Sequence, residues 1–341
     1  MAVRIGVNGF GRTGRAFLRV ALERELGIEI VAVNDLAAPS ALASLLARDS
    51  VFGRYRDRVS VEGDEMLVGR HRITMLSEPD LKALPWADLA VDVVVESTGR
   101  FTARDQAVAH LDAGAPRVVV SAPSKGADAT FVMGVNDSTF DPERHVVVSN
   151  ASCTTNCLVP MLKVLDDAFG VEHGFMTTVH AYTGDQRLVD GLHKDPRRAR
   201  AAAINIVPTT TGAARSVGEV LPHLAGRLDG IALRVPVPDG SATDLVATVR
   251  SAPNADEVRR AFRQAASTPP LAGRLEYAEE GLVSTDIIGD PASCVFDAGL
   301  TMAEGNLVKV LGWYDNEWGY ANRLAELAAK VGQAAPPSVR R

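Results

Sequence analysis

The residues best suited to chemistry lie in the segment Ser152-Cys153-Thr154-Thr155-Asn156-Cys157. A helical pattern begins at Cys153 and runs over residues 153–169, so this thiol should lie in the first turn of a helix. The helix dipole there lowers a thiol pKa and favours the nucleophilic thiolate. A cysteine is more often a small buried hydrophobe, but the hydroxyl residues around this one are too polar for a packed core. We therefore predict Cys153 as the nucleophile and Cys157, one turn later, as buried beside it.

A base for such a thiol is offered by His180, which lies within a strand-like apolar run at residues 175–182. A lone histidine in a strand is more often a satisfied core residue than a catalyst. Next to an activated cysteine it becomes a general base or acid and can stabilise the thiolate. The hypothesis requires that the two side chains meet in the fold.

Two further features could bind an anion. Arg234 stands inside an apolar strand-like run, where a buried arginine needs either an internal carboxylate or an anionic ligand. The segment Thr209-Thr210-Thr211-Gly212-Ala213-Ala214 leads into a helix. Threonine and glycine at a helix amino terminus can cradle an anion, or they can simply cap the helix. Both interpretations of this segment stay open.

A nucleotide site is indicated by Gly9-x-Gly11-x-x-Gly14, which follows an apolar run at residues 3–8 and opens a helical pattern. A second apolar run, at 28–33, ends at Asn34-Asp35, about 20 residues after the last glycine, as a dinucleotide-binding fold requires. The helix amino terminus would bind the pyrophosphate, and Asp35 would accept hydrogen bonds from ribose hydroxyls but repel a 2'-phosphate. The pattern favours NAD over NADP. The alternative is a packing turn with a surface aspartate.

The elements that must position these residues differ between the two halves of the chain. In the first half, further strands are expected at 91–96, 117–121, 130–135 and 145–149, with a helix over 103–113. Strands that alternate with helices indicate a mostly parallel sheet. After about residue 150, strand-like runs at 175–182, 230–236, 243–249 and 307–313 indicate an antiparallel sheet with helices on one face. The predicted fold class is α/β: a Rossmann dinucleotide-binding domain plus an α+β domain with a mostly antiparallel sheet.

Composition excludes several other functions. The chain has 341 residues, which favours two domains, and 36 Lys+Arg against 42 Asp+Glu give a net charge of −6. This balance argues against nucleic acid and anionic membranes as partners. Three cysteines form neither a disulfide framework nor a zinc-ligand spacing, so we expect no metal site and a reducing cytoplasmic location. The amino terminus has no export-signal pattern, and no apolar run is long enough to span a bilayer.

Four motifs taken in order carry a family resemblance: Asn8-Gly9-Phe10-Gly11-Arg12, the cysteine segment 152–157, Thr178-Val179-His180-Ala181-Tyr182-Thr183 and Trp313-Tyr314-Asp315-Asn316-Glu317-Trp318-Gly319-Tyr320. Over almost its whole length the chain resembles phosphorylating glyceraldehyde-3-phosphate dehydrogenases. The resemblance implies an NAD-binding Rossmann domain of residues 1–151, completed by a C-terminal helix at 316–335, and a catalytic domain of residues 152–315. It also implies a homotetramer in which the polar loop 184–200 packs beside a neighbouring subunit's cofactor.

The resemblance further implies a reaction. Cys153 would attack the aldehyde carbon of glyceraldehyde 3-phosphate while His180 accepts the hydroxyl proton, NAD would take the hydride, and inorganic phosphate would release 1,3-bisphosphoglycerate from the resulting thioester. It places the substrate phosphate on Thr183, Asp185 and Arg234, the attacking phosphate on Ser152, Thr154, Thr211 and Gly212, and the cofactor on Gly9, Gly11, Arg12, Thr13, Asp35, Thr98, Ser121, Asn316 and Tyr320.

The sequence departs from this family at three places. Ser77-Glu78-Pro79 stands where many relatives have Arg-Asp-Pro near the adenine, and Gly191-Leu192 stands where many have Leu-Pro. After Arg234, the segment 236–241 replaces the commoner Asn-Val-Ser version with Asp239-Gly240-Ser241. Two alternative functions are weighed: an erythrose-4-phosphate dehydrogenase, which shares the fold and cysteine segment, and a non-catalytic redox-sensing or binding protein whose Cys153 is an oxidisable thiol.

Overall fold

A computed structural model describes residues 2–336 of the chain. Contacts between Cα atoms divide it into two compact units. The first unit comprises residues 2–131, 139–151 and 321–336, and the second comprises residues 132–138 and 152–320. Each is described below by itself.

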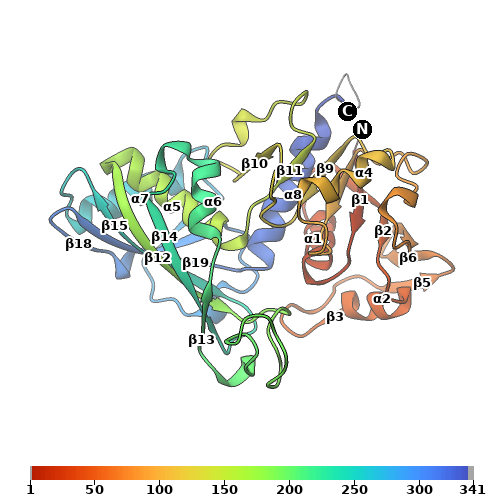
Figure 1. The fold of residues 1–341 in the computed structure, drawn as a ribbon, viewed down its shortest axis with the longest axis horizontal. Coiled ribbons are helices and arrows are strands. Elements are labelled where there is room, and N and C mark those ends of the chain that lie inside the picture. Colours follow the sequence, from red (N-terminus) through yellow and green to blue (C-terminus); the bar gives the residue numbers. More distant parts are fainter. Residues whose placement is uncertain (1, 337–341) are drawn as a thin grey trace. The chain divides into compact units, whose positions relative to one another are not determined.

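The first unit is built on a nine-stranded sheet (Figure 1), whose strand order is β10-β11-β9-β8-β1-β2-β7-β6-β5. The strands from β10 to β7 run parallel, and β6 and β5 continue the sheet as antiparallel hairpins. The central strands are buried nearly throughout, because a parallel sheet has both faces covered. The strands are β1 (Val3–Asn8), β2 (Ile28–Asn34), β5 (Val59–Glu62), β6 (Glu65–Val68), β7 (His71–Leu76), β8 (Val93–Glu96), β9 (Arg117–Val120), β10 (Ala129–Thr130) and β11 (Val147–Ser149), beside a separate pair, β3 (Arg48–Asp49) and β4 (Gly53–Arg54).

Helices of this unit follow its strands, as the alternating pattern predicts. The helix expected over 103–113 is divided at Val108, because tighter bonds such as Leu111 N–H to Val108 O interrupt the regular helical ladder. The hairpins β5 to β7 were not predicted. The helices are α1 (Arg12–Glu23), α2 (Pro39–Ala47), α3 (Arg104–Ala107), α4 (Ala109–Asp112) and most of α8 (Trp318–Gln333).

The strand expected at residues 130–135 is largely wrong. Only Ala129–Thr130 forms a strand there. The chain then turns, because the Asn136 and Asp137 side chains accept hydrogen bonds from the Val132 and Gly134 amides at 2.9 and 2.7 Å. A turn of this kind depends on polar side chains that follow the apolar run, so hydrophobicity alone gives a misleading strand.

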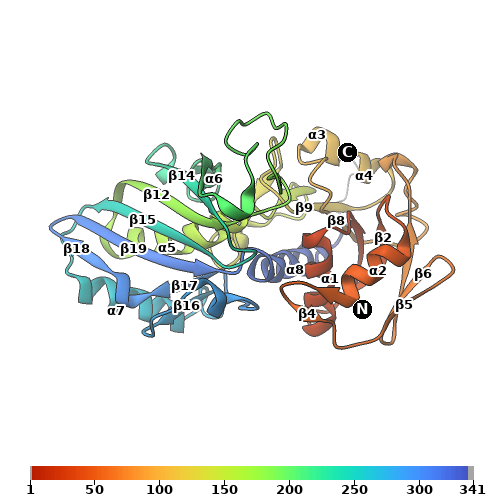
Figure 2. The ribbon, with the colours of Figure 1, turned by 90° about the horizontal axis from the view of Figure 1, so that it is seen from below.

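The second unit contains a mostly antiparallel sheet of order β13-β14-β12-β15-β19-β17-β16, with β18 paired to β19 (Figure 2). Two of its pairings are parallel, β12 with β14 and β16 with β17. The parallel register sets residue 180 of β12 opposite residue 234 of β14. The strands are β12 (Val171–Ala181), β13 (Val207–Thr210), β14 (Leu228–Val235), β15 (Ser241–Val249), β16 (Leu275–Ala278), β17 (Cys294–Asp297), β18 (Met302–Glu304) and β19 (Leu307–Tyr314).

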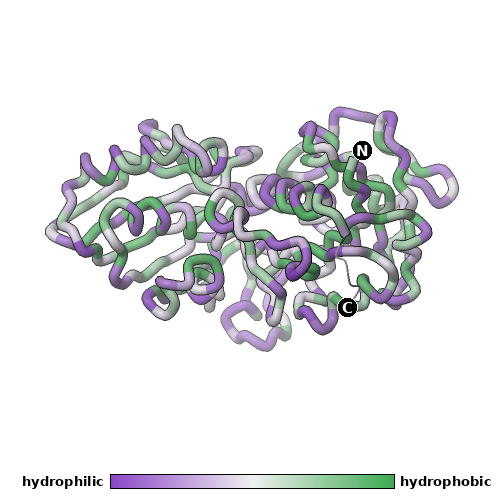
Figure 3. The backbone as a smooth tube through the Cα atoms, turned by 90° about the horizontal axis from the view of Figure 1, so that it is seen from above, coloured by the Kyte–Doolittle hydropathy of each residue, from purple (hydrophilic) through white to green (hydrophobic). Residues whose placement is uncertain are grey.

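The helices of the second unit pack on this sheet, and α5 is its most buried helix. In each unit, hydrophobic segments (green in Figure 3) gather on the inner strands, while hydrophilic segments (purple) form outer loops. The two sheet types confirm the predicted fold class. Over residues 2–336, no helix is both long enough and apolar enough to cross a membrane. The helices are α5 (Cys153–Phe169), α6 (Ala213–Val220) and α7 (Ala255–Ser267).

Candidate active site

Cys153 is the first residue of α5, as the helical pattern predicts. The Ser152 side chain caps this helix by accepting a hydrogen bond from the Thr155 amide at 3.0 Å. Just before the cap, Ala151 adopts a φ of 55°, a left-handed conformation that costs a non-glycine residue free energy. The strained corner and the cap together fix where the helix begins, and therefore where the thiol points.

His180, near the end of β12, meets this thiol. Its Nε2 lies 3.4 Å from the sulfur of Cys153. The Tyr314 ring packs edge-on against the imidazole, with ring centres 5.9 Å apart. The Tyr314 hydroxyl is held in turn by the hydroxyls of Thr178 and Thr154, at 2.8 and 2.9 Å. The structure thus brings together the two side chains that the sequence singled out, and it locks the imidazole in place.

Arg234 lies on the other side of the imidazole, because β12 and β14 pair in register. Its Nη1 is 2.5 Å from Nδ1 of His180 and donates to the Ala181 carbonyl at 3.1 Å. The same carbonyl is 2.7 Å from Nδ1. The two neighbours make opposite demands, since the guanidinium needs a lone pair on Nδ1 and the carbonyl needs a proton there. Which nitrogen of His180 carries the proton therefore depends on where Arg234 donates.

The electrostatics of this pair differ from the expectation. Burial raises the pKa of the Cys153 thiol to about 11, although Arg234 acts to lower it. Burial also lowers the pKa of His180 to about 3, and the positive charge of Arg234 lowers it further. The predicted depression of the thiol pKa by the helix terminus is outweighed because the desolvation of a buried thiolate is the larger effect. The thiol is partly accessible, and at rest both the thiol and the imidazole beside it are neutral.

The residues expected to hold the substrate phosphate are placed at the end of β12 and on β14. Arg234 is largely buried, and this burial lowers its pKa. Asp185 forms an ion pair with Arg198 and lies 3.5 Å from His193 Nε2. Although partial burial opposes it, the hydrogen bond from Arg198 lowers the pKa of Asp185. Thr183 precedes this cluster, and its amide donates to the side chain of Gln186 at 3.3 Å.

The residues expected for the attacking phosphate divide into two groups. Gly212 is the cap residue of α6, and the Thr211 hydroxyl accepts a hydrogen bond from the Ala213 amide at 3.2 Å. The position where a Gly212 side chain would project is open. Ser152 and Thr154, by contrast, use their hydroxyls inside the protein, on Thr155 and Tyr314.

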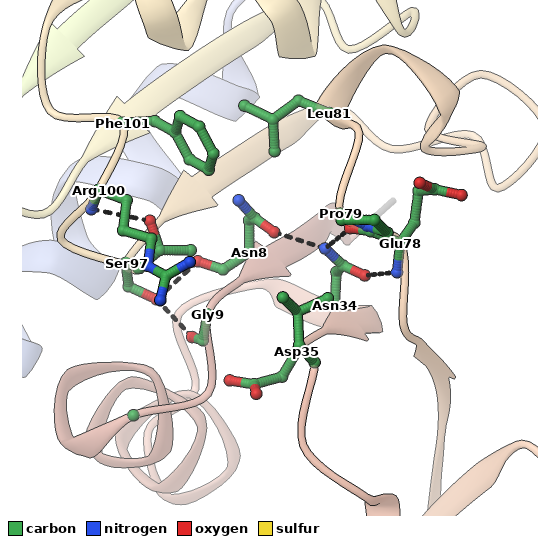
Figure 4. A pocket seen from close by; sticks show the side chains of 13 residues that line it. Asn8, Gly9, Asn34, Asp35, Glu78, Pro79, Leu81, Ser97, Arg100 and Phe101 are labelled. Carbon is green, nitrogen blue, oxygen red and sulfur yellow. Dashed lines mark hydrogen bonds between the residues drawn. The ribbon is translucent and has the colours of Figure 1, made fainter.

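A cavity of about 300 Å³ in the first unit is lined by the glycine turn and by the carboxyl ends of β1, β2 and β8 (Figure 4). Gly9 has a φ of 95°, and a side chain there would lie 2.6 Å from the backbone of Thr98. Gly11 borders open space. Leu36, Pro79, Leu81 and Phe101 supply apolar walls suited to an adenine ring. The cradle and its walls therefore fit a dinucleotide.

Of the other expected cofactor residues, Asp35 and Thr98 line this cavity, whereas Arg12, Thr13 and Ser121 lie elsewhere in the first unit and Asn316 and Tyr320 in the second. Asp35 accepts hydrogen bonds from the amides of Phe10 and Ala37 at 2.8 and 3.0 Å, so its carboxylate is oriented beside the glycine turn. Arg12 and Thr13 open α1, where Arg12 lies 3.7 Å from Asp49. Ser121 follows β9, and its amide donates to Glu96 O at 2.9 Å. Asn316 accepts a hydrogen bond from the Ser241 hydroxyl at 2.6 Å, and Tyr320 is buried on α8.

Comparison with known proteins agrees with this geometry. Residues 3–104 match the family described as glyceraldehyde 3-phosphate dehydrogenase, NAD binding domain, and residues 152–316 match the C-terminal domain of the same enzyme. The chain belongs to the glyceraldehyde-3-phosphate dehydrogenase family. Similar proteins include glyceraldehyde-3-phosphate dehydrogenase 2 of Streptomyces arenae, 58% identical over 98% of this chain and 100% of the relative. The glyceraldehyde-3-phosphate dehydrogenase of Kitasatospora aureofaciens is 58% identical, over 95% of this chain and 97% of the relative. That of Mycobacterium avium is 54% identical, over 98% of this chain and 100% of the relative.

The family resemblance drawn from the four motifs is thereby confirmed, and the matched first domain supports NAD as the cofactor. Sequence reasoning missed two residues beside the site. Arg198 donates to Thr209 Oγ1 at 2.9 Å as well as pairing with Asp185, and Tyr314 holds the His180 ring. Arg198 lies in the charge-rich loop 184–200, and that charge was the only signal that could have pointed to it. Tyr314 lies inside the motif at residues 313–320, one of the four that carry the family resemblance.

Proposed function

We propose that this chain is an NAD-dependent phosphorylating glyceraldehyde-3-phosphate dehydrogenase that converts glyceraldehyde 3-phosphate and inorganic phosphate into 1,3-bisphosphoglycerate. The observation that carries the proposal is the Cys153 sulfur, 3.4 Å from His180 Nε2 at the start of α5. A thiol and an imidazole at this distance are the parts that acyl transfer through a covalent intermediate requires. Membership of the family and the identity to named relatives supply the substrate class.

The first step follows from the positions of these two groups. Cys153 loses its proton to Nε2 of His180 and attacks the aldehyde carbon, and His180 returns this proton to the developing oxyanion, which gives a neutral thiohemiacetal. For Nε2 to accept that proton, the other proton of the ring must sit on Nδ1, where the Ala181 carbonyl accepts it at 2.7 Å. Arg234 then has to donate elsewhere, and a substrate phosphate is the acceptor it needs. In this way phosphate binding and base formation favour each other.

Oxidation and phosphate attack complete the reaction. Bound NAD would supply the hydride acceptor for the thiohemiacetal carbon, and the carbon would then remain on Cys153 as a thioester. His180 takes the hydroxyl proton as the carbonyl forms. Inorganic phosphate then attacks the thioester carbon, the acyl phosphate leaves, and the cysteine is regenerated. We assign the open cap at Gly212, with Thr211, Ser152 and Thr154, to the attacking phosphate, and Thr183, Asp185 and Arg234 to the substrate phosphate.

We also propose how the cofactor is held. Gly9, Gly11, Arg12 and Thr13 would bind the pyrophosphate at the amino terminus of α1. Asp35 would accept the ribose hydroxyls and so favour NAD over NADP. We assign Thr98 and Ser121 to the middle of the cofactor, and Asn316 and Tyr320 to its nicotinamide end.

At the level of the whole molecule, we propose a cytoplasmic homotetramer. Several apolar side chains of the second unit are exposed, among them Leu192 at 96% and Phe175 at 75%. Surfaces of this kind support association between copies of the chain. The three cysteines are free, as in a reducing compartment. We assign residues 1–151 with the helix at 316–335 to cofactor binding and residues 152–315 to catalysis. Light scattering on the purified protein tests the tetramer.

The test of the activity is a turnover assay with NAD, phosphate or arsenate, and two aldehydes. We expect glyceraldehyde 3-phosphate to be oxidised faster than erythrose 4-phosphate, and the opposite order would assign the chain to the alternative dehydrogenase. Cys153→Ser should abolish turnover, because a serine hydroxyl is too weak a nucleophile beside a neutral imidazole. Turnover that survives this change would overturn Cys153 as the nucleophile, and a wild-type protein without turnover would favour the non-catalytic redox-sensing alternative.

A further inference from the structure

A second histidine, His110 on α4, is completely buried in the first unit and takes no part in the reaction proposed above. Its two ring nitrogens contact two different side chains. Trp86 Nε1 donates to Nδ1 at 3.1 Å, and Nε2 lies 3.0 Å from Glu96 Oε2. An indole can only donate, so Nδ1 must be an acceptor and the proton must sit on Nε2. Trp86 therefore fixes His110 as a donor to Glu96.

Glu96, the last residue of β8, is just as deeply buried and is fully used as an acceptor. Its Oε2 also accepts from the Asn8 side chain at 2.6 Å. Its Oε1 accepts from the amide of Thr98 at 2.8 Å and from the Thr98 hydroxyl. Four donors thus converge on one carboxylate within the core. A group that satisfies four donors in a low-dielectric interior fixes the positions of all of them.

A series of hydrogen bonds runs from Glu96 to the wall of the 300 Å³ cavity and fixes the orientation of each side-chain amide along it. Because the Asn8 amide nitrogen faces Glu96, its oxygen faces Asn34 and accepts a bond from that side chain at 2.8 Å. Asn34 then bonds both backbone groups of Glu78, at 2.9 and 2.8 Å, as Figure 4 shows. Reversing any amide along this series would set a donor against a donor. The segment 77–79, where this sequence departs from many relatives, is held in place by this series.

We propose that the buried pair of His110 and Glu96 positions the residues that bind the adenosine end of the cofactor. The inference rests on the NAD-dependent activity proposed above. Both residues lie behind the cavity wall, and His110 is not among the residues that line it. They act at this end through Asn8 and Asn34, which hold segment 77–79, and the same carboxylate also holds Thr98, assigned above to the middle of the cofactor. They are positioning residues, and their loss should affect only ligands that carry adenosine.

The experiment compares a ligand with adenosine and a cofactor without it. Binding of ADP-ribose to the full chain is measured by calorimetry, and turnover is measured with nicotinamide mononucleotide in place of NAD. For His110→Leu we expect ADP-ribose affinity to fall about tenfold, since the charged acceptor loses a donor. Turnover per enzyme with the mononucleotide should stay within about twofold. His110→Gln, whose amide can still donate to Glu96, should restore most of the affinity.

Val118→Ala is the matched control, because Val118 is fully buried in the same core cluster as Trp86 but carries no polar group. Val118→Ala should lower the melting temperature but should not weaken ADP-ribose binding relative to turnover with nicotinamide mononucleotide. If it weakens ADP-ribose as much as His110→Leu does, or if His110→Leu leaves that affinity unchanged, the positioning role is wrong. If His110→Leu does not fold, Trp86→Phe and His110→Gln decide the matter by the same readouts. Wild-type protein that binds neither ADP-ribose nor NAD would overturn the proposed function itself.

Discussion

Replacing His180 with asparagine removes the base that faces Cys153 and leaves the thiol to ionise into water. At 3.4 Å, a thiolate and an imidazolium attract each other by about 5 kcal/mol at an effective dielectric constant of about 20, which equals about 3.6 pKa units. The variant loses this attraction. With a thiol pKa of about 11 and a His180 pKa of about 3, the pair is neutral at rest, and only about 3 in 10,000 molecules carry a thiolate at pH 7.5, so His180 acts as the base during the attack itself. We expect a loss in kcat of about 10²- to 10⁴-fold.

The assay is alkylation of Cys153 by iodoacetamide, followed by mass spectrometry of the peptide that contains it, from pH 6 to pH 10. In the His180→Asn variant, the rate at pH 7.5 should fall below wild type, because no imidazole takes the thiol proton as the sulfur attacks, and it should rise about tenfold per pH unit up to pH 10. Cys294 is buried and lies in a different peptide, so its alkylation serves as an internal control for local unfolding. A variant that alkylates as fast as wild type at neutral pH would refute the role of His180 in ionising the thiol.

Four further outcomes follow from the same site. Arg234→Leu should raise the KM for glyceraldehyde 3-phosphate about 100-fold and change that for unphosphorylated glyceraldehyde little, which steady-state kinetics would check. Asp35→Asn should weaken NAD about tenfold and improve NADP turnover, because the charge facing a 2'-phosphate is gone. Asp185→Ala should raise the KM for glyceraldehyde 3-phosphate in the same kinetic assay, because Arg198 loses its carboxylate partner. Since burial lowers the pKa of His180 from 6.5 to about 3, the unfolded chain binds one more proton between these values. Stability therefore falls by up to about 1.4 kcal/mol per pH unit as the pH drops through this range, and His180→Asn should flatten that slope in urea titrations.

The sequence predicts the strands and helices that carry chemistry because their patterns are strong and local. The strand before Gly9, the helix after Cys153 and the strand around His180 all lie close to where hydrophobic periodicity places them. The hairpins β5 to β7 escaped prediction, since short amphipathic strands with charged residues give little periodic signal. The turn after Thr130 was misread because side-chain hydrogen bonds decide it.

The electrostatics of the site could not be predicted from the sequence. A helix terminus is visible as a local pattern, so a depressed pKa for Cys153 was the natural expectation. Desolvation depends on how much protein surrounds the sulfur, which only the packed structure shows. The same limit applies to His110, which has no motif around it. Its importance lies in partners 24 and 14 residues away in the sequence.

The decisive contact of the site depends on strand register. His180 and Arg234 are 54 residues apart in the chain, and they meet because β12 and β14 pair in parallel without a shift. Side chains alternate between the two faces of a sheet, so a slip of one residue would send Arg234 to the opposite face from the imidazole. The buried residues on these strands hold the register, since a slip would also expose Met176 and Ala232. The packing of an apolar sheet face therefore determines which cation stands beside the catalytic base.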